Sequence, residues 1–163
     1  MIVYHGSTEI IKNPDVVHSK KYLDFGRGFY ITTFENQAKK WAVRKGMRQE
    51  KTAIVNIYEL SEEWDEFKVL SFEKENEKWL DFVCACRKGQ SLNKEYDIIV
   101  GNVADDDVFK TVDMYFRGLW DKKKVLGELR YYKMNNQICI VNQETLNQLI
   151  TFKRAYEVKN NGR

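Results

Sequence analysis

Apolar positions recur with two different periods along this chain, and the period separates the expected strands from the expected helices. Alternating or short apolar runs predict strands at residues 2–4, 28–32, 52–59, 97–100, 137–141 and 152–158. Apolar residues three or four positions apart predict helices over residues 35–46, 79–86 and 108–119, and in a short segment after Asn142. Residues 124–133 fit either structure and are interpreted as helical. Residues 8–28 show little periodicity, so a long connection is expected there, with an extended piece around residues 16–18.

Residues with capping preferences mark the expected ends of the helices. Thr33 is placed to cap the first helix and Gly46 to end it, and Asn142 is placed to cap the last one. The helix around Trp79 is amphipathic, and its polar face is expected to carry Glu77, Lys78, Asp81 and Arg87.

The order of these elements predicts an α+β fold built on a mainly antiparallel sheet. Gly26 and Gly28 are not followed by a third glycine at the offset that a dinucleotide-binding turn requires, and the sequence has no G-x-x-x-x-G-K-[ST] phosphate loop. No repeat and no linker-like segment interrupts the chain. Residues 1–158 are therefore interpreted as a single domain, and residues 159–163 as a disordered tail.

Composition narrows the class of protein further. The 163 residues include nine Tyr, nine Phe and four Trp, which is far too many aromatic residues for a disordered chain. A formal net charge of +3 neither requires nor excludes a nucleic-acid partner. No run approaches the roughly 18 apolar residues of a membrane span, and the first residues do not resemble a secretory signal. A cytoplasmic location without membrane contact is therefore expected.

The cysteines and acidic runs do not predict a metal site. Cys84, Cys86 and Cys139 have neither disulfide-scaffold nor zinc-ligand spacing, so they are interpreted as buried thiols in a reducing compartment. The run of three aspartates at residues 105–107 is interpreted as the start of a helix, where carboxylates are favoured by the helix dipole.

Two side chains near the N-terminus are candidates for chemistry. His5 follows the first strand and precedes Gly6, a position where another molecule can approach the backbone closely. Phe29 and Tyr30 must face opposite sides of a strand, and a tyrosine suits a cleft because it combines a flat ring with a hydroxyl. Taken alone, a structural role explains each of these residues at least as well as a functional role.

Several motifs that follow one another in a fixed order favour the functional role of these two residues over the structural one. They are Tyr4-His5-Gly6-Ser7, the segment DFGRGFYIT at residues 24–32, Gln37-Ala38-x-x-Trp41-Ala42, residues 96–101 with residues 103–106, and residues 136–140. Over nearly the whole chain, they resemble a bacterial family of proteins of unknown function that is placed in the ADP-ribosyltransferase superfamily. The resemblance implies that superfamily's split β-sandwich, in which two small sheets enclose a cleft for NAD and helices lie outside them.

The resemblance also implies roles for individual residues. The branch of the superfamily that includes diphtheria toxin and the poly(ADP-ribose) polymerases uses a His, a Tyr and a third acidic or amide residue from separate strands. By this likeness, His5 would bind the adenosine-side ribose of NAD, and the backbone of Gly6 would grip the nicotinamide amide. Tyr30 would stack on the nicotinamide ring, and Gln137 falls at the third position.

Further contacts with NAD are expected from the neighbouring segments. Ser7 and Ser19 are candidate hydrogen-bonding partners of ribose or phosphate, and Gly28 belongs to the same candidate set. Arg27 could bind the pyrophosphate through its guanidinium, although a solvated loop arginine is an equally good explanation. Gln37 and Trp41 lie one helical turn apart, which is explained most simply by core packing.

Gln137 departs from the glutamate that many enzymes of this kind have at the third position. Its carboxamide can accept a hydrogen bond from a ribose hydroxyl, but it cannot act as a base at neutral pH. The resemblance therefore favours a single transfer over polymerisation. Asp24 and Glu144 are carboxylates that could compensate, but both are interpreted as solvated surface residues.

These observations lead to an NAD-dependent mono-ADP-ribosyltransferase as the main hypothesis. It would modify a protein or a nucleic acid, as toxins, effectors and phage-defence proteins of this superfamily do, and a small neutralising partner protein is expected by resemblance. A first alternative is a catalytically degenerate module that binds NAD, ADP-ribose or a protein. A second alternative, an activity like that of tRNA 2′-phosphotransferase, would require additional arginines converging on the cleft.

Overall fold

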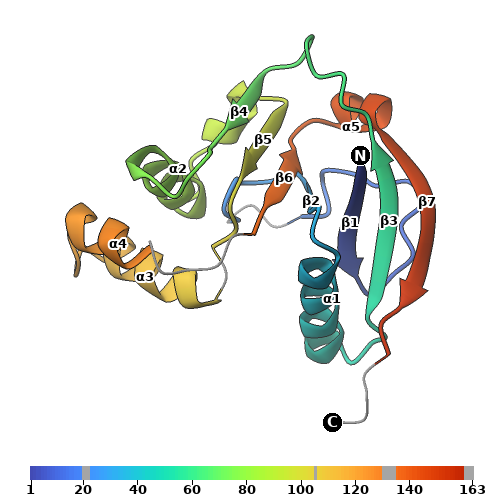
Figure 1. Cartoon of the computed structure of the whole chain (residues 1–163), viewed down its shortest axis with the longest axis horizontal. Coiled ribbons are helices and arrows are strands. Elements are labelled where there is room, and N and C mark those ends of the chain that lie inside the picture. The colour runs from blue at the N-terminus through green and yellow to red at the C-terminus, as the bar shows by residue number, and fades with distance from the viewer. Residues whose placement is uncertain (20–22, 105, 130–134, 160–163) are drawn as a thin grey trace.

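The chain folds into two β-sheets and a set of flanking helices. The computed structural model describes residues 1–19, 23–104, 106–129 and 135–159. In these residues the chain forms five α-helices, one 3-10 helix and two sheets, which confirms the expected α+β class. Figure 1 shows the three-stranded sheet on one side, the four-stranded sheet beside it, and α2, α3 and α4 beyond the second sheet. Residues 160–163 of the predicted tail lie outside the described residues.

The strands of both sheets pair mostly in antiparallel fashion. The strands are β1 (Ile2–Ser7), β2 (Phe29–Ile31), β3 (Ile54–Leu60), β4 (Val69–Ser71), β5 (Ile98–Gly101), β6 (Gln137–Ile140) and β7 (Ile150–Glu157). The first sheet has the order β1-β3-β7 and the second has the order β2-β6-β5-β4, and the only parallel pair among them is β4 with β5. All six predicted strands are confirmed. Residues 16–18, which were expected to be extended, form bends instead.

The helices confirm most of the periodicity in the sequence. They are α1 (Glu35–Gln49), α2 (Glu77–Arg87), α3 (Asp106–Phe116), α4 (Lys122–Leu129) and α5 (Gln143–Leu149), with a 3-10 helix η1 (Leu92–Glu95). The ambiguous segment is helical as far as Leu129, and residues 130–134 lie outside the described residues. Asn142 caps α5 as predicted, because its side chain accepts a hydrogen bond from the Thr145 N–H at 2.8 Å. In the described part of the chain, no helix is sufficiently long and apolar to span a membrane.

The start of α1 at Glu35 agrees with the prediction, but the predicted cap and the predicted end of this helix are wrong. Phe34 occupies the N-cap position, and the Thr33 hydroxyl is instead hydrogen-bonded to the side-chain nitrogen of Asn136 at 2.6 Å. At the other end the helix continues through Gly46 and terminates at Glu50, which adopts a left-handed φ of 53°. A Cβ at Gly46 would lie 2.7 Å from the Lys51 carbonyl oxygen, so this glycine permits the close return of the chain after the helix.

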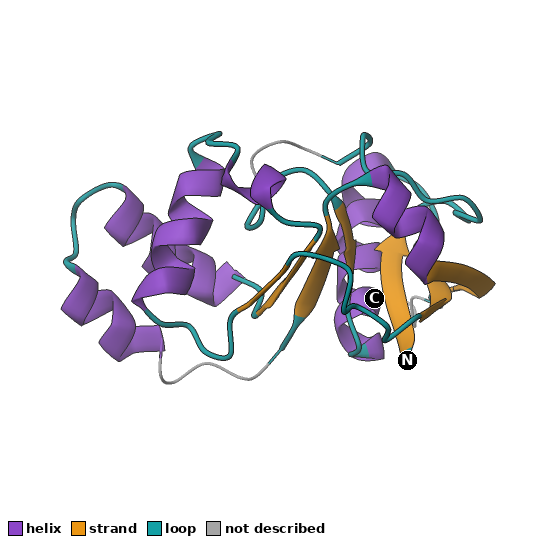
Figure 2. Ribbon diagram, turned by 90° about the horizontal axis from the view of Figure 1, so that it is seen from above, coloured by secondary structure: helices purple, strands orange, loops and turns teal. Residues whose placement is uncertain are grey.

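Alternation along the strands produces a different hydrophobic cluster on each face of the second sheet. Ile99 and Cys139 face α2, α3 and α4 and pack with residues of those helices such as Trp79 and Val112. The opposite face packs against the first sheet and α5, with buried members that include Phe29, Ile31, Ile138, Ile140, Val3, Tyr58 and Leu146. Figure 2 shows the second sheet lying between two groups of helices, α2–α4 on one side and α1 with α5 on the other. Each sheet is therefore buried on the face that meets the other.

The two sheets are joined where β1 passes β2. Tyr4 and Thr32 form an isolated antiparallel bridge with N–H to O distances of 2.8 and 3.0 Å. Next to this bridge, Gly6 packs tightly against α1, because a Cβ at Gly6 would lie 2.2 Å from the Ala38 carbonyl oxygen. We call residues 4–6 of β1, together with Tyr30 and Ile31 of β2 and the following Thr32, the seam. The seam contains two of the three predicted catalytic residues.

Candidate functional site

His5 lies at the seam and is held in its neutral form. Its ring stacks on Phe29 with the ring centroids 4.5 Å apart, and its Nδ1 lies 2.6 Å from the Tyr30 carbonyl oxygen. Because a carbonyl oxygen only accepts hydrogen bonds, Nδ1 must carry the proton. Burial lowers the pKa of His5 to about 4, and the positive charge of Lys45 acts in the same direction. At neutral pH the remaining nitrogen, Nε2, is therefore an unprotonated acceptor.

Tyr30 projects from the opposite face of β2 and is fixed by the loop that precedes this strand. Its hydroxyl donates to the Gly26 carbonyl oxygen at 2.5 Å and accepts from the Phe25 N–H at 3.1 Å. Burial raises the pKa of Tyr30 well above its usual value, and the nearby Cys139 and Asp24 add to this shift. The phenol therefore stays protonated. Tyr30 as a whole is half-buried, and its hydroxyl is already engaged by these two backbone groups.

Gln137 begins β6 and lies on the same face of the second sheet as Tyr30. Tyr30 pairs with Cys139 across the two strands, and Gln137 precedes Cys139 by two residues, so the three side chains share one face. The Gln137 side chain is buried. Its nitrogen, Nε2, donates to Asp24 Oδ2 at 3.0 Å and to the Asn102 carbonyl oxygen at 3.4 Å.

Asp24 is buried, so the expectation that it lies on the solvated surface is wrong. It is only 7% exposed, and its carboxylate accepts hydrogen bonds from Arg87, Gln137 and the Ala104 N–H. Arg87 was expected on the polar outer face of its helix, but it turns inward because a buried carboxylate requires a partner of opposite charge. Glu144, the other carboxylate considered, is exposed as predicted.

The other residues predicted to contact NAD differ in their burial and in their hydrogen bonds. The Ser19 hydroxyl accepts a hydrogen bond from the Gly28 N–H at 2.9 Å, so these two residues stabilise the loop before β2. Ser7 is buried at the end of β1. Arg27 is exposed, and its carbonyl oxygen accepts from the Asn93 side chain at 3.0 Å. The Arg27 guanidinium is therefore accessible to an anionic ligand.

The structure joins the three principal residues in one network but divides them between two sides of β2. The His5 ring lies against Phe29 on the side of β2 that faces the first sheet, whereas Tyr30 and Gln137 face the helices α2–α4. The link between the two sides is the hydrogen bond from His5 to the Tyr30 backbone. Two cavities of about 280 and 420 Å³ lie near α5, around Gln143 and Thr145, and no predicted site residue lines either of them.

The contacts that tie α1 to the start of β6 were not predicted from the sequence. The Gln37 side-chain nitrogen donates to the Asn136 carbonyl oxygen at 2.7 Å, although the two residues are 99 positions apart. Within the described residues, the buried Oε1 of Gln37 has no hydrogen-bond partner. Trp41, one turn further along α1, has its Cβ beside Gly6 and is partly exposed. No local pattern could have revealed these pairings, because they depend on how α1 packs.

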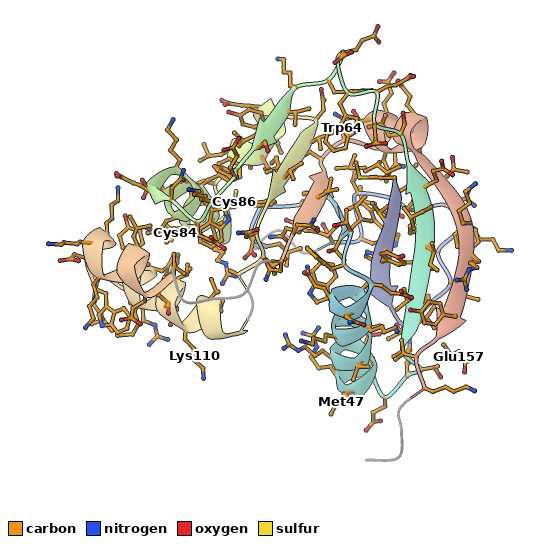
Figure 3. The ribbon with its side chains drawn as sticks, viewed as in Figure 1. Met47, Trp64, Cys84, Cys86, Lys110 and Glu157 are labelled. Carbon is orange, nitrogen blue, oxygen red and sulfur yellow. The ribbon has the colours of Figure 1, made fainter. Side chains whose placement is uncertain are left out.

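The cysteines confirm the prediction of buried thiols. Cys84, Cys86 and Cys139 are free and buried, and burial raises the pKa of Cys84 to about 11 and that of Cys86 to about 12. In Figure 3, Cys84 and Cys86 lie on α2 among crowded side chains, whereas Met47 and Lys110 lie at the periphery. As far as the described residues show, no three His, Cys, Asp or Glu side chains are placed to hold a metal ion.

These features define an α+β protein whose two small sheets meet at a seam that bears a neutral histidine. The sequence profile of a family described as "Protein of unknown function (DUF3990)" matches residues 1–152, and the chain belongs to this family. Comparison with curated proteins produced no match.

Proposed function

We propose that the protein is an NAD-dependent mono-ADP-ribosyltransferase that acts on a macromolecule. The observation that carries the proposal is the network of His5, Tyr30 and Gln137, which come from three strands and are connected by the Tyr30 backbone and the loop at residues 24–28. A His, a Tyr and an amide in this order are the residues that the resemblance to the ADP-ribosyltransferase superfamily calls for. The pairing of two small sheets with outer helices is compatible with that superfamily's split β-sandwich.

Transfer of ADP-ribose from NAD requires the protein to bind and orient a dinucleotide. The bond between the nicotinamide nitrogen and ribose C1′ breaks, its electron pair leaves on nicotinamide, and a nucleophile of the acceptor bonds to C1′ and releases its proton. Nε2 of His5 can accept a hydrogen bond from a ribose hydroxyl, and the exposed part of the Tyr30 ring can stack on a flat base. On the other side of β2, the Gln137 carbonyl oxygen can accept from a hydroxyl of the second ribose, so His5 and Gln137 would each hold one of the two sugars of the dinucleotide.

Neither of the polar residues beside Tyr30 suits the role of a general base. Gln137 is neutral, and the Asp24 carboxylate is already surrounded by donors. The acceptor should therefore bring a good nucleophile, such as a base nitrogen or a thiol, and transfer should stop after one ADP-ribose. We place this activity in the bacterial cytosol, as that of a toxin, effector or phage-defence protein with a small neutralising partner.

A module that binds NAD or ADP-ribose without transfer is the second candidate. The neutral Gln137 favours it, as does the engagement of the Tyr30 hydroxyl by the loop, because both reduce the groups left for catalysis. An activity like that of tRNA 2′-phosphotransferase has less support. Arg87, which could have served a phosphate, is paired with Asp24.

The experiment that tests the proposal follows nicotinamide release from NAD by the pure protein in the presence of bacterial lysate. Protein and nucleic-acid fractions are examined by mass spectrometry for added ADP-ribose. We expect His5→Ala and Gln137→Ala to lower release at least tenfold, whereas His18→Ala, a change of an exposed histidine, should leave it unchanged. If NAD raises the Tm and no nicotinamide appears, the binding module is correct. If NAD produces neither effect, both candidates are wrong.

A further inference from the structure

Asp24 occupies a position where all of its acceptor capacity is used. Its Oδ1 accepts from Nε of Arg87 at 2.9 Å and also from the Nη2 of the same guanidinium. Its Oδ2 accepts from the Ala104 N–H at 3.0 Å and from Nε2 of Gln137 at 3.0 Å. A carboxylate has about four lone-pair sites, so these four hydrogen bonds saturate it. Asp24 therefore cannot take a proton from an acceptor or bind a ribose hydroxyl without losing a buried partner.

The surroundings of Gln137 determine which end of its carboxamide points inward. The two groups that face it, Asp24 Oδ2 and the Asn102 carbonyl oxygen, are both obligate acceptors. Only the NH₂ group can face two acceptors, so a flipped amide is excluded by chemistry. Both described hydrogen bonds of the carboxamide use its nitrogen, and its oxygen is the atom left to accept from a ligand.

We propose that Asp24 is a positioning residue that, with Arg87, holds the Gln137 carboxamide so that its oxygen is presented to the ribose of NAD. This inference rests on the proposed function for the identity of the ligand. Under this inference, the negative charge beside β6 belongs to Asp24 in the loop, whereas Gln137 itself is neutral. The amide of Gln137 then suits its surroundings, and its presence in place of a glutamate is not a loss of function.

A glutamate at position 137 would not fit this arrangement. Its carboxylate would lie about 3 Å from Asp24 Oδ2 and would also face the Asn102 carbonyl oxygen. Two buried carboxylates at this distance cannot both be ionised without a large energetic cost, so one would take up a proton or the loop would move. The expected result of Gln137→Glu is therefore a loss of stability and of turnover.

The same loop also positions Tyr30. Phe25 and Gly26 directly follow Asp24, and their backbone groups hold the Tyr30 hydroxyl at 3.1 and 2.5 Å. A displacement of Asp24 would therefore move the Tyr30 ring together with the Gln137 amide. The ion pair to Arg87 anchors this loop to α2.

The test exchanges the charge and the amide between the two positions. Asp24→Asn, Gln137→Glu and the double variant are compared with wild type by thermal unfolding and by nicotinamide release from NAD. Glu144→Gln, a change of an exposed carboxylate, serves as the matched control and should behave like wild type. We expect each single variant to lower the Tm by about 5 °C or more and to lower kcat about tenfold.

The double variant provides the decisive comparison, because an asparagine at 24 can donate to a glutamate at 137. Its loss of Tm should be clearly smaller than the sum of the two single losses, and its kcat should exceed that of Gln137→Glu. The rescue will be partial, since the asparagine NH₂ would face the Ala104 N–H. Additive losses of Tm, or a Gln137→Glu variant that is as stable as wild type, would overturn the inference. Rescue of the Tm with no nicotinamide release from wild type would instead support the pairing and reject the proposed function.

Discussion

On the side of β2 that faces the first sheet, His5 lies against the Phe29 ring and makes its described hydrogen bond to a backbone carbonyl. On the other side, Asp24, Arg87 and Gln137 form a buried cluster in which charges and amides are matched by partners. The first environment keeps a titratable group neutral by desolvation, whereas the second retains a charge by pairing it. Stability should therefore respond to pH on the first side and to the loss of a partner on the second.

The largest expected effect is the removal of Arg87. Arg87→Ala leaves the Asp24 carboxylate buried without its ion-pair partner, and this should lower the free energy of unfolding by about 3–5 kcal/mol. The matched control is Arg117→Ala, because Arg117 pairs with Asp113 on the surface, and its loss should cost about 0.5 kcal/mol or less. Urea unfolding of both variants measures the difference. Equal losses would show that Asp24 is not a buried, paired charge.

The next effect concerns His5 and pH. The pKa of His5 is about 4 in the folded chain and 6.5 in the unfolded chain, so the unfolded chain binds a proton first as the pH falls. The free energy of unfolding should decrease between pH 6.5 and 4 by up to about 3 kcal/mol from this residue alone. Urea unfolding at several pH values should give a flatter profile for His5→Gln than for wild type. If His18→Gln flattens the pH profile as much as His5→Gln does, the pH dependence of stability does not come from His5.

A third comparison contrasts two glycines. Gly6→Ala forces a Cβ into the backbone of α1, and the overlap should cost about 1–3 kcal/mol of unfolding free energy. Gly127 lies in α4 with nothing within 4 Å of the position of a Cβ, so Gly127→Ala should stabilise the protein by about 1 kcal/mol. Thermal unfolding should shift in opposite directions for the two variants. A shift in the same direction would contradict the packing of the seam against α1.

The smallest effect is expected from removal of a hydroxyl. Tyr30→Phe leaves the Phe25 N–H and the Gly26 carbonyl oxygen without their partner and should cost about 1–2 kcal/mol. Tyr115→Phe removes a more exposed hydroxyl that is bonded to Asp81, and should cost less. If the Tyr30 ring alone contacts the ligand, Tyr30→Phe should also keep most of the binding of NAD, which calorimetry can measure. A complete loss of binding would assign the ligand contact to the hydroxyl.

The longest strands, β3 and β7, were predictable because apolar and β-branched residues recur along their seven and eight residues. β4 was missed although β2, which is equally short, was predicted. Phe29 and Ile31 of β2 are buried, whereas Val69 and Ser71 of β4 are exposed, so β4 has no buried apolar pair to indicate a strand. The cap and the C-terminal end of α1 were wrong because Thr33 bonds to Asn136 and Gly46 permits a close approach of the chain, and both causes are tertiary.

The candidate site was predictable only in part. His5, Tyr30 and Gln137 are the residues that the resemblance indicates, and the structure connects them through hydrogen bonds and the loop at residues 24–26. The burial of Asp24 could not be predicted, because its partner Arg87 is 63 positions away and a carboxylate in a loop has no periodicity. Sequence patterns report local geometry, whereas the pairing of buried charges depends on contacts between distant segments.

The most direct test of the central claim is the ¹⁵N NMR spectrum of the His5 ring at neutral pH, recorded with and without NAD. The account predicts a proton on Nδ1, an unprotonated Nε2, and a shift of the Nε2 resonance and of the Gln137 side-chain amide when NAD is added. A proton on Nε2, or resonances of both residues that stay unchanged at saturating NAD, would contradict it.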